Sequence, residues 1–241
     1  MSHGSLVDCL WTTPALFESQ YAVLPKEAPA DLRRFREAKK PSDETLKSIE
    51  FWDDFEMKAR GKDIVSQEDL LKAQQAISML NQHPVAKSLL DCSETQVAFV
   101  GEIDFFGMKL SAKCLLDLLP TSGPFQGKIV DLKTTNDVDA EYSMTKIAAR
   151  FGYPMKLAFY RTCLKNAGIE TDPEPIIIWQ GSNFPYEVKV RYIPEDVMKG
   201  ADREVNSLIS KLMTINPRKF SDLFDTDVKP MSFAPYQMFS E

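Results

Sequence analysis

The sequence is poor in the residues that bind transition metals, because its 241 residues include only two histidines and four cysteines. Cys9, Cys92, Cys114 and Cys163 are far apart, and no two of them have the CxxC spacing. This spacing argues against zinc ribbons and against dithiol redox chemistry. We expect four reduced and mostly buried thiols, as in a cytosolic protein.

Long apolar runs are also missing. No run approaches the roughly 20 residues that a membrane-spanning helix needs. Residues 1–5 do not open a basic region followed by an apolar signal core. We therefore expect a cytoplasmic protein with no membrane partner. A chain of 241 residues and 27.3 kDa is long enough for one substantial domain.

An excess of positive charge is the third absence, since the net charge is −6 and the pI is near 5.2. Non-specific binding of nucleic acid depends on cations that neutralise phosphates, so a generic nucleic-acid coat protein is disfavoured. A nucleic-acid enzyme of this composition would have to concentrate positive charge locally and use metal ions. The basic cluster at residues 33–40 is one candidate for phosphate contact.

The order of the predicted elements indicates an α/β protein with a mixed central sheet flanked by helices. Hydrophobic periodicity and capping signals predict helices at 4–13, 44–60, 67–82, 140–151, 153–166 and 194–215. Alternation and β-branched residues predict strands at 95–101, 108–119, 127–133, 175–180 and 186–192. We expect one domain over 1–241, with a helical part at 1–92, a core at 93–194, a C-terminal helix at 195–215 and an extended tail at 216–241.

The most informative segment is 128–135, a predicted strand with an acid and a base two residues apart. Side chains alternate along a strand, so Asp131 and Lys133 share one face and Val130 and Leu132 share the other. Asp117 ends another predicted strand fourteen positions earlier. Two neighbouring carboxylates ionise readily only with a cation between them, and carboxylate oxygens favour Mg²⁺ or Mn²⁺.

A metal ion held in this way lowers the pKa of a bound water and stabilises the charge that develops at phosphorus. Lys133 is placed to orient or deprotonate that water or to steady the phosphoryl oxygens. The segment therefore suggests a metal-dependent phosphodiesterase. A simpler interpretation is a D-x-K sequence that decorates a solvated strand edge, and the spacing alone favours it.

Three blocks of the sequence, two of which contain the acids described above, resemble a known family. Lys113 to Asp117, Asp131–Thr135 and Tyr153–Tyr160 resemble the PD-(D/E)xK nuclease core of the RecE family, the phage-type exonuclease VIII. Gly4–Leu10 and the proline-flanked segment that follows it resemble the family's first helix and next strand. The resemblance extends in ordered blocks from about residue 4 to about residue 195.

This resemblance implies a PD-(D/E)xK restriction-endonuclease-like fold in which Asp117 and Asp131 bind the metal, together with the backbone carbonyl of Leu132. Lys133 would serve the attacking water. Glu94 falls where the family places a glutamate ahead of the first core strand, although an exposed acid at a strand start is an equally good explanation. Some relatives of this fold carry an iron–sulfur cluster, which needs three clustered late cysteines, and this sequence lacks them.

The chain departs from the family pattern at two positions. The family's first helix reads G-x-x-x-H, and its histidine binds the metal. This chain has Asp8 at that position. Aspartate is a competent ligand for Mg²⁺, but the same replacement would also be expected in a decayed site. The family's later Q-x-x-x-Y becomes Lys156-x-x-x-Tyr160. Residues four apart share a helical face, so Lys156 and Tyr160 can meet the same phosphate. Lys113 is a third expected DNA contact.

The resemblance further implies a Mg²⁺-dependent exodeoxyribonuclease, for which Mn²⁺ can substitute. It would degrade linear double-stranded DNA from 5′ to 3′ in phage-type homologous recombination within a bacterial host. A homo-oligomeric ring, by analogy a tetramer, and a single-strand annealing recombinase are the implied partners. Two alternatives stay open, which are a catalytically decayed DNA-binding module and a nuclease that acts on single strands or cuts internally.

Overall fold

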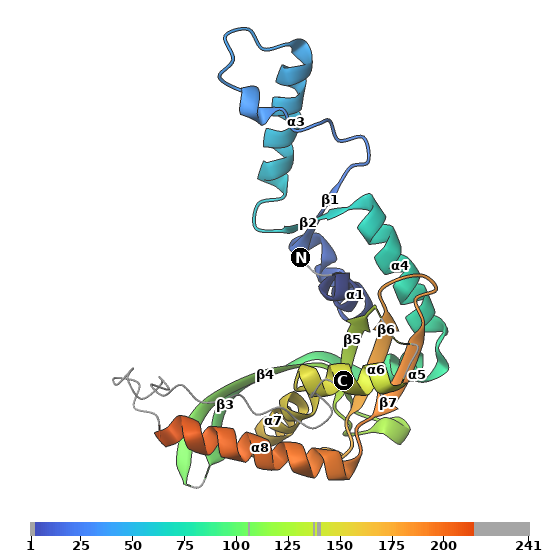
Figure 1. Cartoon of the computed structure of the whole chain (residues 1–241), viewed down its shortest axis with the longest axis vertical. Coiled ribbons are helices and arrows are strands. Elements are labelled where there is room, and N and C mark those ends of the chain that lie inside the picture. Colours follow the sequence, from blue (N-terminus) through green and yellow to red (C-terminus); the bar gives the residue numbers. More distant parts are fainter. Residues whose placement is uncertain (1–2, 106, 137, 139–140, 215–241) are drawn as a thin grey trace, which may run out of the picture.

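The computed structural model describes residues 3–105, 107–136, 138 and 141–214. In this part of the chain a central sheet has helices on both faces, and a helical arm projects from one end (Figure 1). The predicted tail at 216–241 lies outside the described residues, as does residue 215 of the predicted last helix. None of the described helices is long and apolar enough to cross a membrane.

The central sheet has five strands in the order β3, β4, β5, β6, β7. Their bounds are Ser93–Phe105 for β3, Met108–Pro120 for β4, Val130–Thr135 for β5, Ile176–Gly181 for β6 and Val188–Tyr192 for β7. β5 and β6 are parallel and the other neighbours are antiparallel, so the sheet is mixed, as predicted. Every residue of β6 is buried, as a parallel strand covered on both faces requires.

Helices cover the sheet in two layers, each with its own apolar core. On one face lie α7 (Tyr153–Asn166) and α8 (Glu195–Thr214), with α6 (Glu141–Arg150) beside them. On the other lie α1 (His3–Thr12), α4 (Gln67–Gln82) and α5 (Pro84–Asp91). Val130 and Leu132 pack into the α1 and α4 core, whereas Ile129 packs into the α7 and α8 core. The side-chain alternation predicted for 128–135 is therefore confirmed.

Two predicted strands differ most from the observed ones, and the other three lie within two residues of their predicted bounds. The strand predicted at 127–133 begins at Val130, because Gly127 adopts a φ of 77° in a turn and its amide donates to the carbonyl of Pro120 at 2.9 Å. The strand predicted at 95–101 extends over 93–105, where it pairs with β4 along its length. Helix α7 has the predicted bounds.

The start of α4 is fixed by a capping box. The hydroxyl oxygen of Ser66 accepts a hydrogen bond from the Asp69 amide at 3.0 Å and donates to the Asp69 carboxylate at 2.7 Å. These bonds satisfy a backbone donor that a helix start otherwise leaves unpaired. At the start of α5, a ring nitrogen of His83 accepts from the Ala86 amide at 3.2 Å, so this histidine serves as a helix cap.

The projecting arm spans the residues between two short strands, β1 (Tyr21–Leu24) and β2 (Asp63–Ser66), which pair in parallel. It contains a 3₁₀ turn at Arg33–Phe35 and helix α3 (Asp43–Lys58). The Trp52 indole on α3 donates to the carbonyl of Pro29 at 3.1 Å. The arm therefore packs on itself, away from the two cores of the sheet (Figure 1).

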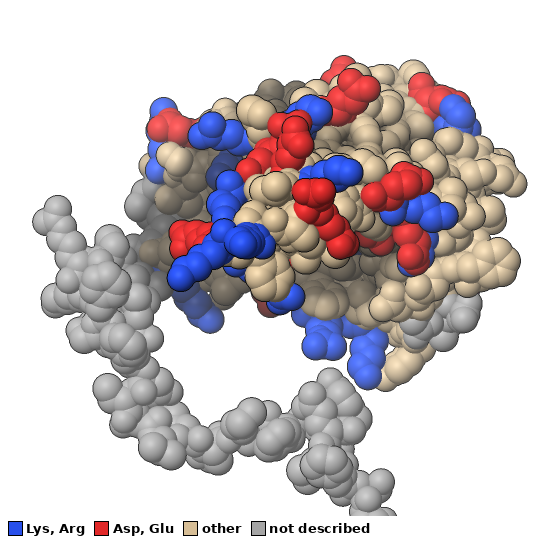
Figure 2. Space-filling model, turned by 90° about the horizontal axis from the view of Figure 1, so that it is seen from above, with Lys and Arg blue, Asp and Glu red and all other residues tan. Residues whose placement is uncertain are grey.

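Acidic side chains engage part of the basic cluster at 33–40. Arg33 forms ion pairs with Asp31 and Glu56, and Arg36 pairs with Asp53. Seen from the end at which α3 projects, Lys and Arg side chains are interspersed with Asp and Glu (Figure 2). This face does not present a uniformly basic surface to a nucleic acid.

Candidate active site

The candidate site lies where β4 and β5 separate. Among the described residues the two strands share one paired position, Leu118 with Val130. Directly beside this pair, a carboxylate oxygen of Asp117 accepts a hydrogen bond from the backbone amide of Leu132 at 2.7 Å. A buried amide needs an acceptor, and here a side chain supplies it. The separation of the strands therefore fixes the Asp117 carboxylate against β5.

Asp131 is the most deeply buried charged group of the site, with 1% of its surface exposed. Its two carboxylate oxygens face two different ammonium groups. Lys133 forms an ion pair with Oδ2, and Lys156 donates to Oδ1 at 3.0 Å. The Lys133 ammonium also donates to the carbonyl of Leu132 at 3.1 Å. The D-x-K sequence is thus part of a buried charge cluster, and the interpretation as a solvated strand edge is wrong.

Helix α7 brings aromatic rings and a second cation to the same place. The Lys133 ammonium lies 5.3 Å from the ring centre of Tyr153, and the Lys156 ammonium lies 5.1 Å from that of Tyr160. Positions 153, 156 and 160 follow helical spacing, so they share one face of α7. The shared face predicted for Lys156 and Tyr160 is confirmed. The pairing of Lys156 with Asp131 was not predicted.

Helix α1 contributes Asp8 to the site. One turn before it, Gly4 lies so close to β5 that an added Cβ would be 2.5 Å from the Thr134 hydroxyl. Residues four apart lie on the same helical face, so this close approach turns Asp8 toward the sheet. The Asp8 carboxylate accepts from the Gln96 amide at 3.0 Å, and the Thr12 hydroxyl lies 3.4 Å from its other oxygen.

Burial and neighbouring charges alter the ionisation of Asp8 and Asp117. Burial is the main cause that raises the pKa of Asp117 to about 7, repulsion from Asp131 adds to it, and attraction to Lys133 opposes it. Burial also raises the pKa of Asp8, against hydrogen bonds from Gln96 and Thr12. Burial alone lowers the pKa of Lys156, but attraction to Asp131 outweighs that effect and raises it. An additional cation would favour the ionised form of both Asp8 and Asp117.

The donor set suits a hard divalent cation. It consists of carboxylate oxygens from Asp8, Asp117 and Asp131 and the carbonyl oxygen of Leu132, the ligand type that Mg²⁺ and Mn²⁺ prefer. Oδ2 of Asp131 is buried and accepts no hydrogen bond, although it faces the Lys133 ammonium. In the described part of the chain, no three His, Cys, Asp or Glu side chains converge closely enough to surround an ion. Metal binding would therefore require the three carboxylates to move closer together and the Lys156 ammonium to move away from Asp131.

Two predicted residues are not part of this cluster. Glu94 is exposed on β3 opposite Leu119, and Lys113 is exposed on β4 opposite Val100. Among the described residues, neither side chain forms a hydrogen bond or ion pair with Asp117 or Asp131. The simpler interpretation of Glu94, an exposed acid at a strand start, fits its position. A DNA contact by Lys113 stays a prediction.

Two residues of the site escaped the sequence analysis. Thr12 lies one helical turn after Asp8, where its hydroxyl donates to the Asp8 carbonyl at 2.8 Å, so helical spacing was a usable signal. Gln96 bonds to both Asp8 and Thr12, at 3.0 and 3.2 Å. Its contact depends on an unusual backbone conformation within β3, for which the sequence gives no signal.

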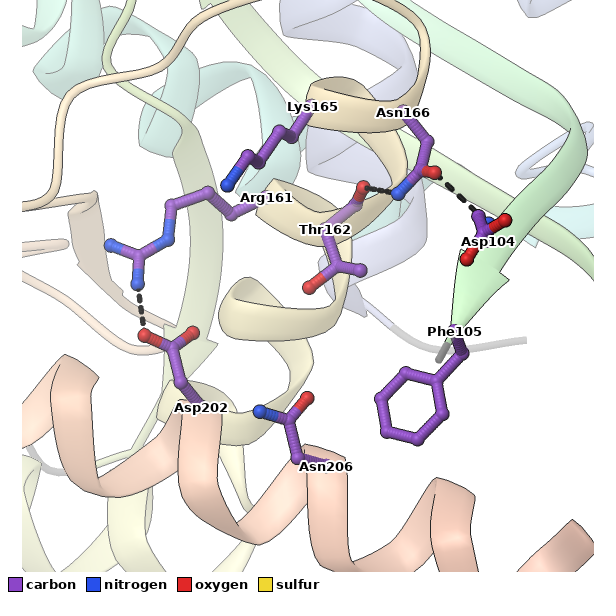
Figure 3. A pocket seen from close by; sticks show the side chains of 8 residues that line it. All are labelled: Asp104, Phe105, Arg161, Thr162, Lys165, Asn166, Asp202 and Asn206. Carbon is purple, nitrogen blue, oxygen red and sulfur yellow. Dashed lines mark hydrogen bonds and ion pairs between the residues drawn. The ribbon is translucent and has the colours of Figure 1, made fainter. Parts of the chain in front are cut away.

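A cavity of about 580 Å³ lies between α7, α8 and the end of β3 (Figure 3). Arg161 pairs with Asp202 across it. The side chain of Asn166 accepts from the Asp104 amide at 3.0 Å and donates to the Thr162 carbonyl at 2.9 Å. These polar groups satisfy one another, and none of the lining residues belongs to the carboxylate cluster. The cavity is therefore not the candidate active site.

Residues 1–221 match the sequence model of a family described as "PDDEXK-like domain of unknown function (DUF3799)". The chain belongs to this family. The predicted PD-(D/E)xK fold, with its mixed five-stranded sheet flanked by helices, is thereby confirmed. The sequence Asp131-Leu132-Lys133 has the D-x-K form that the family's name contains.

Two solved structures resemble the fold. One is a crystal structure from Eubacterium rectale described as a "Putative exonuclease", with 14% identity, a TM-score of 0.49, and coverage of 87% of this chain and 79% of that chain. The other is SSO0001, with 14% identity, a TM-score of 0.33, and coverage of 95% and 98%. Similarities this distant carry no inference about function. No curated protein matches the sequence.

Proposed function

We propose that this protein is a metal-dependent DNA nuclease that hydrolyses phosphodiester bonds at the cluster of Asp117, Asp131 and Lys133. The observation that carries the proposal is the meeting of a fully buried carboxylate, Asp131, and a half-buried one, Asp117, beside a lysine where β4 and β5 separate. Acids with a perturbed pKa, as Asp117 has, cluster at functional sites. Membership of a PDDEXK-like family supports the same conclusion.

In this proposal each side chain of the cluster has a task. Asp117, fixed by the Leu132 amide, and Asp131, once Lys156 has left its Oδ1, would hold a divalent cation together with Asp8. When bound, this cation would polarise the scissile phosphate and favour ionisation of a water. Lys133, held by Asp131 and the Leu132 carbonyl, is directed to donate a hydrogen bond to the attacking water or to a phosphate oxygen. Lys156 and Tyr160 present a cation and a hydroxyl from α7 for phosphate contact.

Hydrolysis of the diester forms a bond between the water oxygen and phosphorus and breaks one phosphorus–oxygen ester bond. The water loses a proton, and the departing nucleoside oxygen gains one. The net effect is one phosphate terminus and one hydroxyl terminus. The cluster thus needs to position water and neutralise phosphate charge, and the residues above cover both tasks.

The sequence resemblance to the RecE family supports a finer proposal. We propose an exonuclease that degrades linear double-stranded DNA from 5′ to 3′ with Mg²⁺ or Mn²⁺, in phage-type recombination. A ring, tetrameric by analogy, would enclose the duplex, so a chain with a net charge of −6 could hold DNA by topology. A single-strand annealing recombinase would receive the exposed strand.

The test is cleavage of matched DNA substrates by the purified full chain. Linear duplexes labelled at the 5′ or the 3′ end, closed circular duplex and single strands are incubated with Mg²⁺, Mn²⁺ or EDTA. We expect metal-dependent release of nucleotides from the 5′ ends of linear duplex, with closed circles left intact. Cutting of circles would instead identify an endonuclease. Binding of linear duplex without cleavage in either metal would contradict the nuclease proposal.

The second candidate is a DNA-binding module without catalysis. The pairing of both Asp131 oxygens with lysine ammoniums favours it, because these lysines neutralise the carboxylate without any metal. Asp8, which stands where the RecE family has a histidine, also favours this candidate. The double variant Asp8→His with Lys156→Gln restores the histidine and the glutamine of the RecE pattern. Cleavage by this variant combined with inactivity of the natural chain would identify a decayed site.

A further inference from the structure

Gln96 has a backbone conformation that extended strands avoid. Its φ is +51°, one of two positive values at non-glycine residues in the described part of the chain. The register of β3 and β4 places Gln96 opposite Asp117, between the pairs Thr95 with Leu118 and Val97 with Leu116. These neighbours pair normally, and the position between them is not part of the ladder. The strand is therefore distorted locally, directly opposite a candidate metal ligand.

The distortion directs the Gln96 side chain to the first helix. Its amide nitrogen donates to the Asp8 carboxylate at 3.0 Å and to the Thr12 hydroxyl at 3.2 Å. These are contacts across 88 and 84 positions of sequence. They join the edge of the sheet to α1 at the point where α1 supplies its carboxylate.

A left-handed backbone at a residue with a side chain costs free energy and persists only when its surroundings compensate for it. Glycine adopts the same conformation with little strain. If only the shape of β3 mattered, glycine would serve position 96 better than glutamine. The amide group of Gln96 is what glycine cannot supply.

We propose that Gln96 is a positioning residue that orients the Asp8 carboxylate toward the cation held by Asp117 and Asp131. This inference rests on the proposed metal-dependent function. Gln96 donates to one Asp8 oxygen and the Thr12 hydroxyl lies 3.4 Å from the other, so each oxygen keeps a lone pair for a metal. Removal of a residue that orients a metal ligand commonly weakens metal binding by about 10- to 100-fold.

The experiment measures Mn²⁺ binding by isothermal titration calorimetry and thermal unfolding in EDTA, using the full chain. Gln96→Gly removes the amide and the backbone strain together, and Gln96→Leu removes the amide while keeping the bulk. We expect Mn²⁺ to bind both variants at least about tenfold more weakly. Both variants lose the same two hydrogen bonds, but only Gln96→Gly relieves the backbone strain, so it should unfold at a higher temperature than Gln96→Leu.

Ala98→Gly is the matched control, because Ala98 is exposed on the same strand and pairs normally with Leu115. It should lower the unfolding temperature and leave Mn²⁺ affinity unchanged. Unchanged Mn²⁺ affinity in both Gln96 variants would overturn the proposal, as would a lower unfolding temperature for Gln96→Gly than for Gln96→Leu. If the natural chain binds Mn²⁺ but does not cleave DNA, the nuclease proposal is contradicted. The proposal for Gln96 is still tested in that case, because its experiment measures Mn²⁺ binding. A chain that binds no Mn²⁺ would contradict both.

Discussion

The carboxylate of Asp117 and the backbone amide of Leu132 are joined by a 2.7 Å hydrogen bond where strands β4 and β5 separate. The bond gives the Leu132 amide the acceptor that a neighbouring strand would normally provide. It also holds the half-buried Asp117 carboxylate near the fully buried carboxylate of Asp131, whose two oxygens already face the ammonium groups of Lys133 and Lys156. Without a metal ion, ionisation of Asp117 beside Asp131 is costly, and this cost can be measured.

Asp117→Asn should change how stability depends on pH. Burial first, and Asp131 second, raise the pKa of Asp117 from 3.8 to about 7. The folded state therefore holds this proton more tightly than the unfolded state, and metal-free protein loses stability as pH rises between about 4 and 7. Asparagine keeps an acceptor for the Leu132 amide and has no charge to desolvate. In EDTA at pH 8, we expect the variant to be more stable by roughly 1–3 kcal/mol, a common size for one substitution.

The check is chemical denaturation at pH 5 and pH 8, with and without Mn²⁺. The stability advantage of the variant should shrink at pH 5, where Asp117 is protonated in the natural chain. Mn²⁺ should stabilise the natural chain more than the variant, because binding to the folded state adds to stability. Equal pH profiles for the two proteins would contradict this account of Asp117.

Gly4→Ala should disturb the placement of α1. An added Cβ would lie 2.5 Å from the Thr134 hydroxyl, which is closer than side chains tolerate. We expect a loss of unfolding free energy of roughly 1–3 kcal/mol, typical of overpacking, together with weaker Mn²⁺ binding through Asp8. Adding Thr134→Ala removes the obstructing hydroxyl and should restore part of the loss.

Gly200→Ala provides the control for that change. Gly200 lies within α8, and the nearest atom to an added Cβ is 3.9 Å away on Arg203. Alanine is the better helix former, so this variant should gain roughly 0.5–1 kcal/mol. If Gly4→Ala were also neutral or stabilising, the close approach of α1 to β5 would not be what turns Asp8 toward the site.

Lys156→Met should strengthen metal binding. The Lys156 ammonium donates to Asp131 at 3.0 Å and so occupies an oxygen that a cation would use. Its removal should lower the Kd for Mn²⁺ by about tenfold, equivalent to about 1.4 kcal/mol. Calorimetry checks this, with Lys165→Met as the control, since Lys165 is exposed on the same helix and lines the separate cavity. Weaker Mn²⁺ binding by Lys156→Met would show that the lysine supports the metal site rather than competing for it.

Lys133→Met should act on the chemical step. Its ammonium is held between Asp131 and the Leu132 carbonyl, where it can assist the attacking water. We expect DNA cleavage to slow by about 10²- to 10³-fold, as for loss of one preorganised donor. DNA binding, followed by fluorescence anisotropy in Ca²⁺, should change far less. A parallel loss of binding and cleavage would assign Lys133 to substrate binding instead.

Local patterns predicted much of the fold and part of the site. Alternation placed Asp131 and Lys133 on one face of β5, and helical spacing gave α7 its bounds and placed Lys156 beside Tyr160. The capping box at Ser66 is also present. Each of these features depends on residues within a few positions of one another, which is the range over which sequence periodicity carries information.

Features that depend on distant contacts were not predictable. Gln96 reaches Asp8 across 88 positions through a distorted strand. Lys156 was expected to face DNA, but its ammonium turns to Asp131. The parallel pairing of β1 with β2 joins segments about 40 residues apart, which periodicity cannot reveal. The helix of the arm was predicted at 44–60 and is present as α3, but the packing of the preceding segment on it was not predicted. The resemblance to the RecE family suggested Glu94 as a site residue, but its side chain is exposed and has no contact with the carboxylate cluster among the described residues.

The most direct measurement compares the natural chain with Asp131→Asn on end-labelled linear duplex DNA in Mg²⁺. Asparagine preserves the shape of the most buried acid and removes the charge on which both lysines and a metal would depend. The account predicts metal-dependent nucleotide release by the natural chain and a loss of at least about 10²-fold in the folded variant. Equal cleavage by the two proteins would contradict the assignment of this cluster as the active site.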